Sequence, residues 1–390
     1  MTAADRGGLV VIGGGPAALA AAIGYRRSGG AGPVHVLSAD TDPPYARPPL
    51  SKAYLRGQTS EDSLELQQTR SYNQHGIRVA LGEAATALQV EARCVTAASG
   101  AEFTFGACVL ATGSHASPLP VSGGDDPRVF LLRSLNHARA LRAAAQDASS
   151  AVVVGSGFIG CEAAASLAAS GLAVTMVSAE ALPQAARLGP EVGERVAGWL
   201  RGAGVTLIGD AQVSAITDGR TVHLAGAEPI TGDLVLTAVG VAPQSQLAAE
   251  AGLAVRDGRV VVDGHLRTTV AGVYAAGDVA LAYNPTAGRH LAVEHWGEAE
   301  AMGTVAGTGA AGGDAQWDVV PGFWTEIGER TLKYAAWGDG FDEARLVSHD
   351  DDAFTVHYGR GGVTVGVLTH NRDADYERGA ELVAAGAPLP

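Results

Sequence analysis

The sequence is poor in cysteine, charge and aromatic residues. Among 390 residues there are three cysteines, 17% charged residues and 5% Phe, Trp and Tyr. Cys94, Cys108 and Cys161 stand far apart, without the paired spacing of a zinc site or a C-x-x-C redox motif. The scarcity argues against a disulfide-stapled fold and favours a reduced compartment, so we expect a cytoplasmic protein.

Long hydrophobic runs and a leader pattern are also missing. The longest uncharged run near the start, residues 9–25, is interrupted by GGGP and is too short to cross a membrane. The first eight residues lack a basic segment followed by a cleavable apolar stretch, so we expect no signal peptide. Eleven histidines are scattered without H-x-x-H or H-E-x-x-H spacing, and we expect no metal.

Positive charge is scarce relative to negative charge. The net charge of −14 repels phosphate backbones and anionic lipid heads, so we expect neither nucleic acid nor a membrane as the main partner. Of the 27 basic residues, only Lys52 and Lys333 are lysines. The 47% of apolar residues is ample for a buried core, and the length predicts two or three domains.

Glycine, in contrast, is abundant: the chain has 53, about twice the ordinary share. The glycines follow short apolar segments, which is typical of turns between strands and helices. Two βαβ units are predicted on this pattern, about 140 residues apart. The first has a strand at 9–12, a turn at 13–15, a helix at 16–27 and a strand at 34–37; the second has the same elements at 151–154, 155–160, 161–170 and 173–177.

Further strands close each unit. Residues 107–111 and 234–239 read as apolar strands that end in a turn, and 272–276 is a strand followed by Gly277 and Asp278. A carboxylate at that position lies at the end of a sheet where open α/β folds bind ligands. Alternating patterns at 331–337, 353–358 and 363–368 predict a small, mainly β terminal region.

The first predicted turn fits the dinucleotide pattern G-x-G-x-x-A. Gly13 permits the tight turn, Gly15 lets a pyrophosphate approach the backbone, and Ala18 permits close helix packing. Pro16 and Ala17 open the helix, whose free N–H groups and positive dipole end attract phosphate.

The second predicted turn, with Gly155, Gly157 and Gly160, is a full G-x-G-x-x-G. Phe158 and Ile159 complete it. Glu180 lies 20 residues further on, near the place of a ribose-binding acid, but it reaches a ribose only if its loop curls back. We favour NAD; NADP stays open, with Arg187 as the nearest cation for a 2′-phosphate.

Two fingerprints in one chain call for two dinucleotides, FAD first and a nicotinamide second. The segment from Tyr45 to Leu55, YARPPLSKAYL, resembles the signature of FAD-dependent ferredoxin reductases that serve oxygenases. Similar stretches follow in family order over nearly the whole chain: 111–113, 132–135, 157–162, 276–278, 293–296 and 323–324. Disulfide reductases of the same superfamily need a cysteine pair that is absent before Cys94.

The resemblance implies catalytic roles for Lys52, Glu162 and Trp324. Lys52 would lie by the flavin ring and pair with Glu162, which favours the charge of reduced flavin and orients the nicotinamide. The alternatives are a surface lysine and an ordinary helix glutamate. Trp324 and Trp296 would flank the flavin, or else pack in the core.

The resemblance also implies the remaining cofactor contacts. Asp278 would bind the ribityl side of FAD, and Arg47 and Arg133 would neutralise its pyrophosphate or fix a loop. Where the family has an acid for the FAD ribose this chain has Ala39, so we assign Asp40 instead. The other expected contacts are Ala111, Thr112, Gly113, Gly240 and Gly277.

We therefore expect an α/β fold with two Rossmann-like dinucleotide-binding domains of the glutathione-reductase type. The FAD domain would comprise 1–116 and 244–317, the NAD(P)H domain 117–243, and a C-terminal α/β domain 318–390. The resemblance implies transfer of electrons from NADH to a ferredoxin-type iron-sulfur protein that serves a P450 or a Rieske oxygenase, by a monomer or homodimer.

Two other functions stay open. One is a same-fold reductase of a quinone, oxygen or a biosynthetic small molecule. The other is a redox-controlled interaction protein, similar to the apoptosis-inducing factors. Cys161 begins the second fingerprint helix, where a small buried residue packs on a strand.

Overall fold

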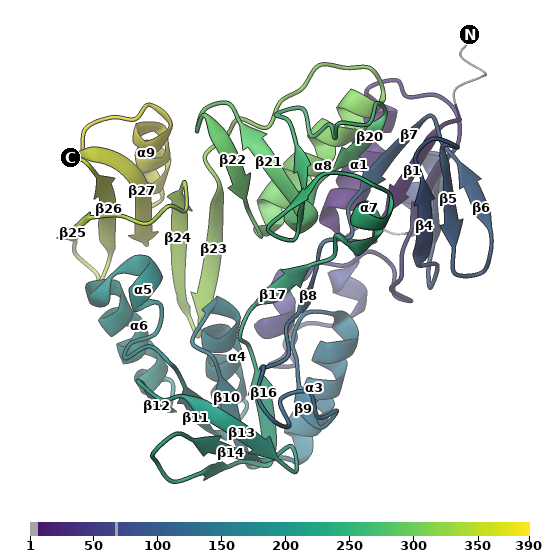
Figure 1. Cartoon of the computed structure of the whole chain (residues 1–390). Coiled ribbons are helices and arrows are strands. Elements are labelled where there is room, and N and C mark those ends of the chain that lie inside the picture. The colour runs from purple at the N-terminus through teal and green to yellow at the C-terminus, as the bar shows by residue number, and fades with distance from the viewer. Residues whose placement is uncertain (1–6, 67–68) are drawn as a thin grey trace. The chain divides into compact units, whose positions relative to one another are not determined.

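The chain divides into two compact units, each assembled from three separate stretches (Figure 1). The first contains Met1–Ala46, Glu65–His115 and Ala242–Phe323, and the second contains Arg47–Leu64, Ala116–Val241 and Trp324–Pro390. The computed structural model describes residues 7–66 and 69–390. The predicted absence of a signal peptide rests largely on residues 1–6, which lie outside the described residues, and the three-domain division stays a prediction.

A five-stranded parallel sheet forms the centre of the first unit. Its strands are short and apolar, and β1 (Leu9–Ile12) is buried along its whole length, as expected where both faces of a parallel sheet are covered. The order is β20-β7-β1-β2-β3. The other bounds are β2 Val34–Leu37, β3 Ile77–Ala80, β7 Ala107–Leu110 and β20 Val273–Ala275.

Helices α1 (Pro16–Arg27) and α8 (Trp296–Ala310) pack closely in the first unit. A Cβ atom on Gly303 would lie 2.2 Å from the carbonyl oxygen of Ala17, and one on Gly307 would lie 2.1 Å from that of Ala21. The two helix backbones can approach this closely only without those side chains. Part of the glycine abundance is thus explained by helix packing, in addition to turns.

Smaller elements complete the first unit. An antiparallel sheet contains β4 Ala85–Gln89, β5 Cys94–Ala97 and β6 Glu102–Thr104. A mixed sheet, in which β19 and β21 are parallel, contains β18 Val255–Arg256, β19 Arg259–Val262, β21 Ala280–Asn284 and β22 Arg289–Ala292. The helices are α2 Thr69–Gln74, α7 Gln246–Glu250 and the 3₁₀ turn η4 Gly277–Val279. Strands β8 (Ser114–Ala116) and β17 (Val241–Pro243) lie where the chain passes from one unit to the other.

The second unit repeats the parallel sheet, in the order β12-β11-β10-β16-β9. Buried Val152, Val154 and Val235 of this sheet belong to a core cluster that also includes Ile216 and Val222. The strands are β9 Val129–Phe130, β10 Ser150–Val154, β11 Ala173–Val177, β12 Val205–Ile208 and β16 Leu234–Thr237, with a smaller sheet of β13 Val213–Thr217, β14 Thr221–Leu224 and β15 Ile230–Thr231. The helices are α3 Leu135–Asp147, α4 Phe158–Ala169, α5 Ala185–Leu188 and α6 Pro190–Gly202, with η2 Pro48–Ser51 and η3 Asp62–Leu64.

The C-terminal part of the second unit is a five-stranded sheet with one helix. The order is β23-β24-β27-β26-β25, and the pairs from β24 to β25 are antiparallel. The bounds are β23 Gly322–Ile327, β24 Arg330–Ala336, β25 Glu343–Ser348, β26 Phe354–Arg360, β27 Val363–His370 and α9 Asp373–Ala384. The sequence patterns find three of the five strands and miss α9, although Asp373 and Asp375 in its first turn are typical of a helix start.

Several predicted element ends are wrong. Helix α4 begins at Phe158 and ends at Ala169, whereas the sequence pattern predicts 161–170. The error arises because Gly160 was assigned to the turn, while it actually lies inside the helix. The strands predicted at 107–111, 234–239 and 272–276 are shorter, since β7 ends at Leu110, β16 ends at Thr237, and β20 covers Val273–Ala275.

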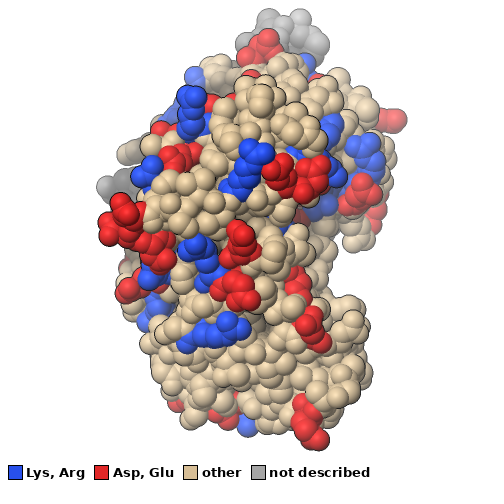
Figure 2. Space-filling model, turned by 90° about the vertical axis from the view of Figure 1, so that its left-hand side faces the viewer, with Lys and Arg blue, Asp and Glu red and all other residues tan. Residues whose placement is uncertain are grey.

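Charged side chains of opposite sign lie close together on the surface. In the second unit Arg195 and Arg330 contact Asp352, and Arg345 pairs with Glu343. Figure 2 likewise shows basic and acidic side chains intermingled on one face. Among residues 7–66 and 69–390, no helix has the length and hydrophobicity of a membrane span.

Candidate active site

The turn between β1 and α1 is shaped by Gly13. Its backbone has φ of +133°, and a Cβ atom there would lie 2.1 Å from the carbonyl oxygen of Ala111. Ala111 belongs to the neighbouring segment after β7, and its N–H donates to Ile12 at 2.8 Å. Any larger residue at position 13 would therefore collide with the protein itself, so this glycine is required by the fold.

Gly15, two residues later, has no such internal reason. It caps α1 with φ of −90°, and a Cβ atom placed on it would have no atom within 4 Å. Pro16 then begins the helix, with Ala17 and Ala18 buried behind it. The open space lies at the positive end of the α1 dipole, which is the arrangement that a bound pyrophosphate requires.

Two further groups of the first unit lie at the same carboxyl edge of the sheet, because they directly follow β7 and β20. The Ser114 hydroxyl donates to Asp278 Oδ2 at 2.6 Å, and Asp278 is buried. Thr112 donates its hydroxyl to the carbonyl of Gln244 at 2.6 Å.

Glycine and an aromatic residue occupy the next expected positions at this edge. Gly113 has a positive φ and open space around its Cβ position, and Gly277 also has a positive φ. Trp296 is the first residue of α8, which packs against both α1 and η4.

The acid after β2 is held by its own loop. Asp40 is half-buried, and its Oδ2 accepts a hydrogen bond of 2.8 Å from the Tyr45 hydroxyl. Its Oδ1 accepts from the backbone of Asp42 at 3.2 Å. Ala39 is exposed. The residues of the first unit that were expected to hold FAD thus follow neighbouring parallel strands, and their open glycines fit a dinucleotide.

The turn between β10 and α4 repeats the first turn. A Cβ atom on Gly155 would lie 2.4 Å from the carbonyl oxygen of Ala238, and one on Gly160 would lie 2.1 Å from that of Gly155. At Gly157 the nearest atom would be 3.9 Å away. Here again the fold explains two glycines and leaves space at the third, as a second dinucleotide requires.

Other expected nucleotide contacts surround this turn. Phe158 and Ile159 are the first residues of α4, and Ile159 is 45% exposed although apolar. Gly240 follows β16 with a positive φ and open space at its Cβ position. These positions give the second site an apolar rim beside its open glycine.

The carboxylate of Glu180 is bonded to the backbone of the loop that follows β11, and its contact with a ribose stays a prediction. Its Oε2 accepts a hydrogen bond of 3.1 Å from the backbone N–H of Ala186. The Ser178 hydroxyl, at the end of β11, accepts from the backbone N–H of Glu180 at 3.0 Å and is bonded to the Ser156 hydroxyl at 2.7 Å. The exposed Arg187 lies with its guanidinium 5.7 Å from the ring centroid of Phe158.

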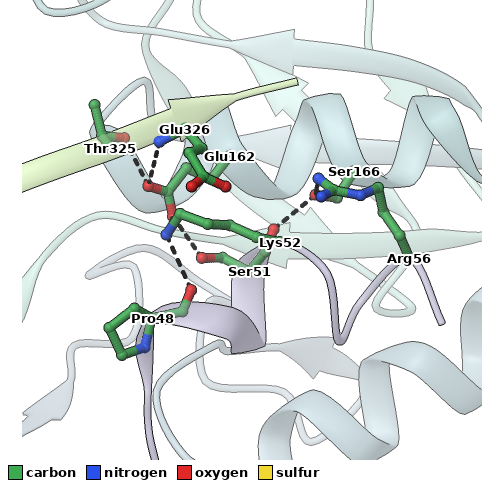
Figure 3. A network of polar contacts seen from close by, with 8 residues as sticks. All are labelled: Pro48, Ser51, Lys52, Arg56, Glu162, Ser166, Thr325 and Glu326. Atoms are coloured by element: carbon green, nitrogen blue, oxygen red, sulfur yellow. Dashed lines mark hydrogen bonds and ion pairs between the residues drawn. The ribbon is translucent and has the colours of Figure 1, made fainter. Parts of the chain in front are cut away.

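A buried ion pair joins Lys52 to Glu162 (Figure 3). Lys52 Nζ lies 2.7 Å from Glu162 Oε2, and the Ser51 hydroxyl donates to the same oxygen at 2.5 Å. The other oxygen, Oε1, accepts from the Thr325 hydroxyl at 2.6 Å and from the backbone of Glu326 at 3.4 Å. Lys52 also donates to the carbonyl of Pro48 at 3.0 Å. Burial of both charges is tolerable because each is paired and hydrogen-bonded.

Trp324 lies against this ion pair and remains partly open to solvent. Lys52 Nζ is 5.0 Å from the centroid of the Trp324 ring, within the range of a cation–π interaction. The Trp324 residue is 47% exposed, which is unusual for so large an apolar group and does not fit core packing. Elsewhere in the second unit, Arg47 donates to the carbonyl of Arg133 at 2.9 Å, so these two residues are brought together.

The sequence patterns do not identify several buried, hydrogen-bonded residues, of which Ser51 and Thr325 belong to this network. Ser51 is next to Lys52 in the signature, so its position gives a signal. Thr325 lies 163 residues from Glu162, and a lone threonine on a strand gives none. Gln184, which donates to the Ser156 carbonyl at 2.8 Å, and the buried Glu298 of α8 were also missed.

The cysteines are buried and unpaired, and burial raises the pKa of Cys108 to about 12 and that of Cys161 further. Cys161 packs inside α4, with its thiol 3.4 Å from the carbonyl of Ser156. Within residues 7–66 and 69–390, no group of three or more His, Cys, Asp or Glu side chains could hold a metal ion.

Known proteins are similar to this chain over most of its length. The family described as pyridine nucleotide-disulphide oxidoreductase matches residues 8–303. The chain is 35% identical over 385 residues to the ferredoxin reductase subunit of 5,5′-dehydrodivanillate O-demethylase from Sphingobium sp., covering 97% of this chain and 93% of the relative. It is 32% identical over 330 residues to rubredoxin-NAD(+) reductase from Pseudomonas putida, covering 83% and 85%.

A solved structure agrees with the sequence relatives. The reductase of the covalent putidaredoxin reductase–putidaredoxin complex has a TM-score of 0.91 and 28% identity, over 97% of this chain and 93% of that one. The predicted fold and the resemblance to ferredoxin reductases are thereby confirmed. With two dinucleotide turns on two parallel sheets and a family match over most of its length, this chain belongs to the pyridine nucleotide-disulphide oxidoreductase family.

Proposed function

We propose that the protein is an FAD-dependent NADH oxidoreductase that delivers electrons to a ferredoxin-type iron-sulfur protein serving a P450 or Rieske oxygenase. The observation that carries the cofactors is the pair of turns in which a Cβ atom on Gly15 would meet nothing within 4 Å and one on Gly157 nothing closer than 3.9 Å. The first glycine of each turn, Gly13 or Gly155, is required by the fold, whereas the fold does not require Gly15 or Gly157. A ligand backbone close to the turn accounts for both.

The first unit would hold FAD and the second NADH. Gly13, Gly15 and the N-terminus of α1 would bind the FAD pyrophosphate, Asp40 its ribose and Asp278 its ribityl side. Gly155, Gly157 and Glu180 would bind the nicotinamide dinucleotide. A bound FAD would supply the chemistry that links a two-electron hydride donor to a one-electron acceptor.

Lys52 would supply a fixed positive charge to the reaction. Glu162 and the Pro48 carbonyl hold its ammonium group in one place, and Ser51 donates to the same Glu162 oxygen, so little reorganisation is needed when negative charge develops nearby. Glu162 in turn is held by Thr325. These groups position charge; none of them needs to transfer a proton in this role.

The names of the relatives support an iron-sulfur acceptor. One relative is the ferredoxin reductase subunit of a demethylase, and a structural neighbour is covalently joined to putidaredoxin. A cytoplasmic location fits an enzyme of this kind. Because the chain carries −14, docking of an acidic ferredoxin requires a local group of arginines, and turnover would then fall at high salt.

The cofactors are tested on the purified protein. We expect yellow flavin absorbance that bleaches anaerobically with NADH, and more slowly with NADPH. Cytochrome c reduction should then depend on added ferredoxin. A colourless protein, or a yellow one that neither nicotinamide bleaches, would disprove the proposal.

The same assays separate the other functions. Ferredoxin-independent reduction of a quinone or oxygen would identify a small-acceptor reductase. Slow turnover, a persistent charge-transfer band and a redox-dependent change of oligomeric state would identify an interaction protein.

The two lysines of the chain provide a matched test of Lys52. Lys52→Arg keeps the charge but replaces a compact ammonium group with a larger planar one, in a buried position with defined acceptors. We expect flavin bleaching by NADH to slow at least tenfold, while thermal stability changes little by comparison. Lys333→Arg, at the half-exposed lysine that pairs with Asp373, should bleach at the parent rate.

A further inference from the structure

The 180–189 loop, which includes the short helix α5, lies between β11 and α6 and carries both candidate determinants of nucleotide choice. Glu180 accepts from the N–H of Ala186 at 3.1 Å. The next residue is Arg187, whose guanidinium lies 5.7 Å from the ring centroid of Phe158. The carbonyl of the residue after that, Leu188, accepts a hydrogen bond from the Tyr358 hydroxyl at 2.8 Å. Three consecutive residues therefore contain the backbone contact of Glu180, the cation and the contact with Tyr358: Ala186, Arg187 and Leu188.

Tyr358 comes from the C-terminal sheet and is rigidly placed. It lies in β26 and is 1% exposed. Its ring packs against Phe341, with centroids 4.6 Å apart, and edge-on against Tyr334 at 5.8 Å. Phe341 also lies 3.5 Å from where a Cβ atom of Gly189 would be. Burial raises the pKa of Tyr358 well above its usual value, so the hydroxyl stays protonated and remains a donor.

A second contact, made by Gln184 in the middle of the loop, joins the loop to the turn between β10 and α4. Gln184 is buried and has φ of +62°, a left-handed conformation that a side chain other than glycine rarely adopts. Its Nε2 donates to the carbonyl of Ser156 at 2.8 Å. Such a strained residue persists when its surroundings hold it in place. The loop is therefore held at Gln184 by the nucleotide-binding turn and at Leu188 by the C-terminal sheet.

We propose that Tyr358 and Gln184 are positioning residues for nucleotide choice: they hold the 180–189 loop so that Glu180 is presented to the ribose and Arg187 stays against Phe158. The inference rests on the proposed nicotinamide site. A carboxylate at this place accepts from a 2′-hydroxyl and repels a 2′-phosphate, whereas an arginine attracts the phosphate. Since both lie in one short loop, its shape decides which of them meets the ribose.

The test compares two ligands that differ only in the 2′-phosphate. ADP-ribose and 2′-phospho-ADP-ribose are titrated calorimetrically into the flavin-loaded protein and into the Tyr358→Phe variant. We expect the parent to prefer ADP-ribose, and the variant to lose about fivefold of that preference, which corresponds to about 1 kcal/mol. A variant that is only partly folded would bind less of both ligands, with an unchanged ratio of dissociation constants.

The matched control is Tyr25→Phe. Tyr25 is also buried and donates to a backbone carbonyl, that of Ala31, at 2.6 Å in the first unit. This variant should keep the parent ratio. If Tyr358→Phe does not fold, Gln184→Gly releases the other end of the loop, because glycine accepts the left-handed backbone and removes only the side-chain bond. It should also lower the ratio.

The Tyr358→Phe substitution is also made in the Glu180→Gln variant, to show whether Tyr358 acts through Glu180. In Glu180→Gln the preference itself should be much reduced, and adding Tyr358→Phe should change it no further. An unchanged ratio in both Tyr358→Phe and Gln184→Gly would overturn the inference. A parent protein that binds neither ligand would instead disprove the proposed nicotinamide site, so the two failures are distinguishable.

Discussion

The turn between β1 and α1 and the turn between β10 and α4 are copies of each other. In each, the first glycine donates to the strand across the sheet, from Gly13 to Leu37 at 2.8 Å and from Gly155 to Val177 at 2.9 Å. In each copy the second strand is followed directly by a serine, Ser38 or Ser178, whose hydroxyl accepts from the N–H of the acid two residues later. Two distant parts of the chain therefore build the same dinucleotide support with the same bonds.

The copies differ at the fifth residue of the helix. In α1 this residue is Ala20, and in α4 it is Glu162, buried and bonded to Lys52, Ser51 and Thr325. The comparison teaches that one scaffold can serve two sites, with a buried charged pair added to a single copy at a position where the other carries a methyl group.

The largest effect is expected from removing the charge that distinguishes the copies. Glu162→Ala leaves Lys52 buried without its counter-ion, which should cost about 3–5 kcal/mol of unfolding free energy. Replacing both partners, Lys52→Met with Glu162→Gln, should recover part of that loss. Chemical denaturation of the flavin-free protein measures both.

The control for this change is Glu194→Ala, at an exposed acid on α6. It should stay within about 0.5 kcal/mol of the parent. A Glu162→Ala variant as stable as Glu194→Ala would show that the buried pair is not needed for the fold of this copy.

The glycines sharpen the likeness between the copies. Gly13→Ala and Gly160→Ala place a methyl group 2.1 Å from a carbonyl oxygen, and each should lose about 1–3 kcal/mol in denaturation. A methyl group would meet no atom within 4 Å in Gly15→Ala and only an ordinary contact at 3.9 Å in Gly157→Ala, so both should leave the flavin-free protein within about 0.5 kcal/mol.

The variants Gly15→Ala and Gly157→Ala should instead each weaken the binding of a different ligand. Gly15→Ala should weaken retention of FAD, measured by flavin content after dialysis, and Gly157→Ala should weaken binding of ADP-ribose. If Gly157→Ala lost FAD and kept nucleotide binding, the assignment of the two turns would be reversed.

Glu298, a buried acid of the first unit, provides a contrast to Glu162. Glu298 accepts from Trp317 Nε1 at 2.7 Å and from the N–H of Gly322 at 3.2 Å, both neutral donors. Burial raises its pKa above the usual 4.5, despite the opposing effect of these bonds. The folded state then retains a proton that the unfolded state has lost, so the contribution of Glu298 to stability falls as pH rises from 4.5 through the raised pKa.

This pH dependence is measured by denaturation across that window in the parent and in Glu298→Gln. In the variant, the unfolding free energy should depend less steeply on pH, because the Glu298 contribution is lost. At the pH where the parent is most stable, the unfolding free energy of the variant should be lower by about 1.5 kcal/mol. An identical slope in both proteins would mean that Glu298 titrates in the folded protein as it does in the unfolded chain.

The smallest effect concerns the serine that one turn has and the other lacks. Ser156→Ala removes the bond of 2.7 Å to Ser178, and Gly14 occupies the corresponding place in the first turn. Ser178 still accepts from Glu180, so we expect a loss of only about 0.5 kcal/mol in thermal or chemical unfolding. A much larger loss would show that this bond organises the second turn.

Local patterns were sufficient to predict the turns and their strands. The glycine positions, the apolar strands and the copy 140 residues later are signals within short windows, and the fold places them as expected. Gly160 shows where such patterns fail. It was assigned to the turn, but it serves helix α4, because only glycine fits against the carbonyl of Gly155.

The residues that complete the site could not be predicted in this way. Thr325, Gln184 and Tyr358 act through contacts with segments far away in sequence or through an unusual backbone angle. A threonine on a strand or a tyrosine in a β sheet is ordinary in its local context. The meeting of such residues is decided by tertiary packing, which a single sequence does not display.

The burial of the three cysteines has a practical consequence. Because Cys94, Cys108 and Cys161 are enclosed, thiol reagents should leave the folded protein untouched. A single cysteine introduced on the surface would then be the only reactive thiol, without replacement of any native one. The chain is thus already suited to site-specific labelling, and its docking to an electron acceptor could be followed by spectroscopic probes or cross-links placed one position at a time.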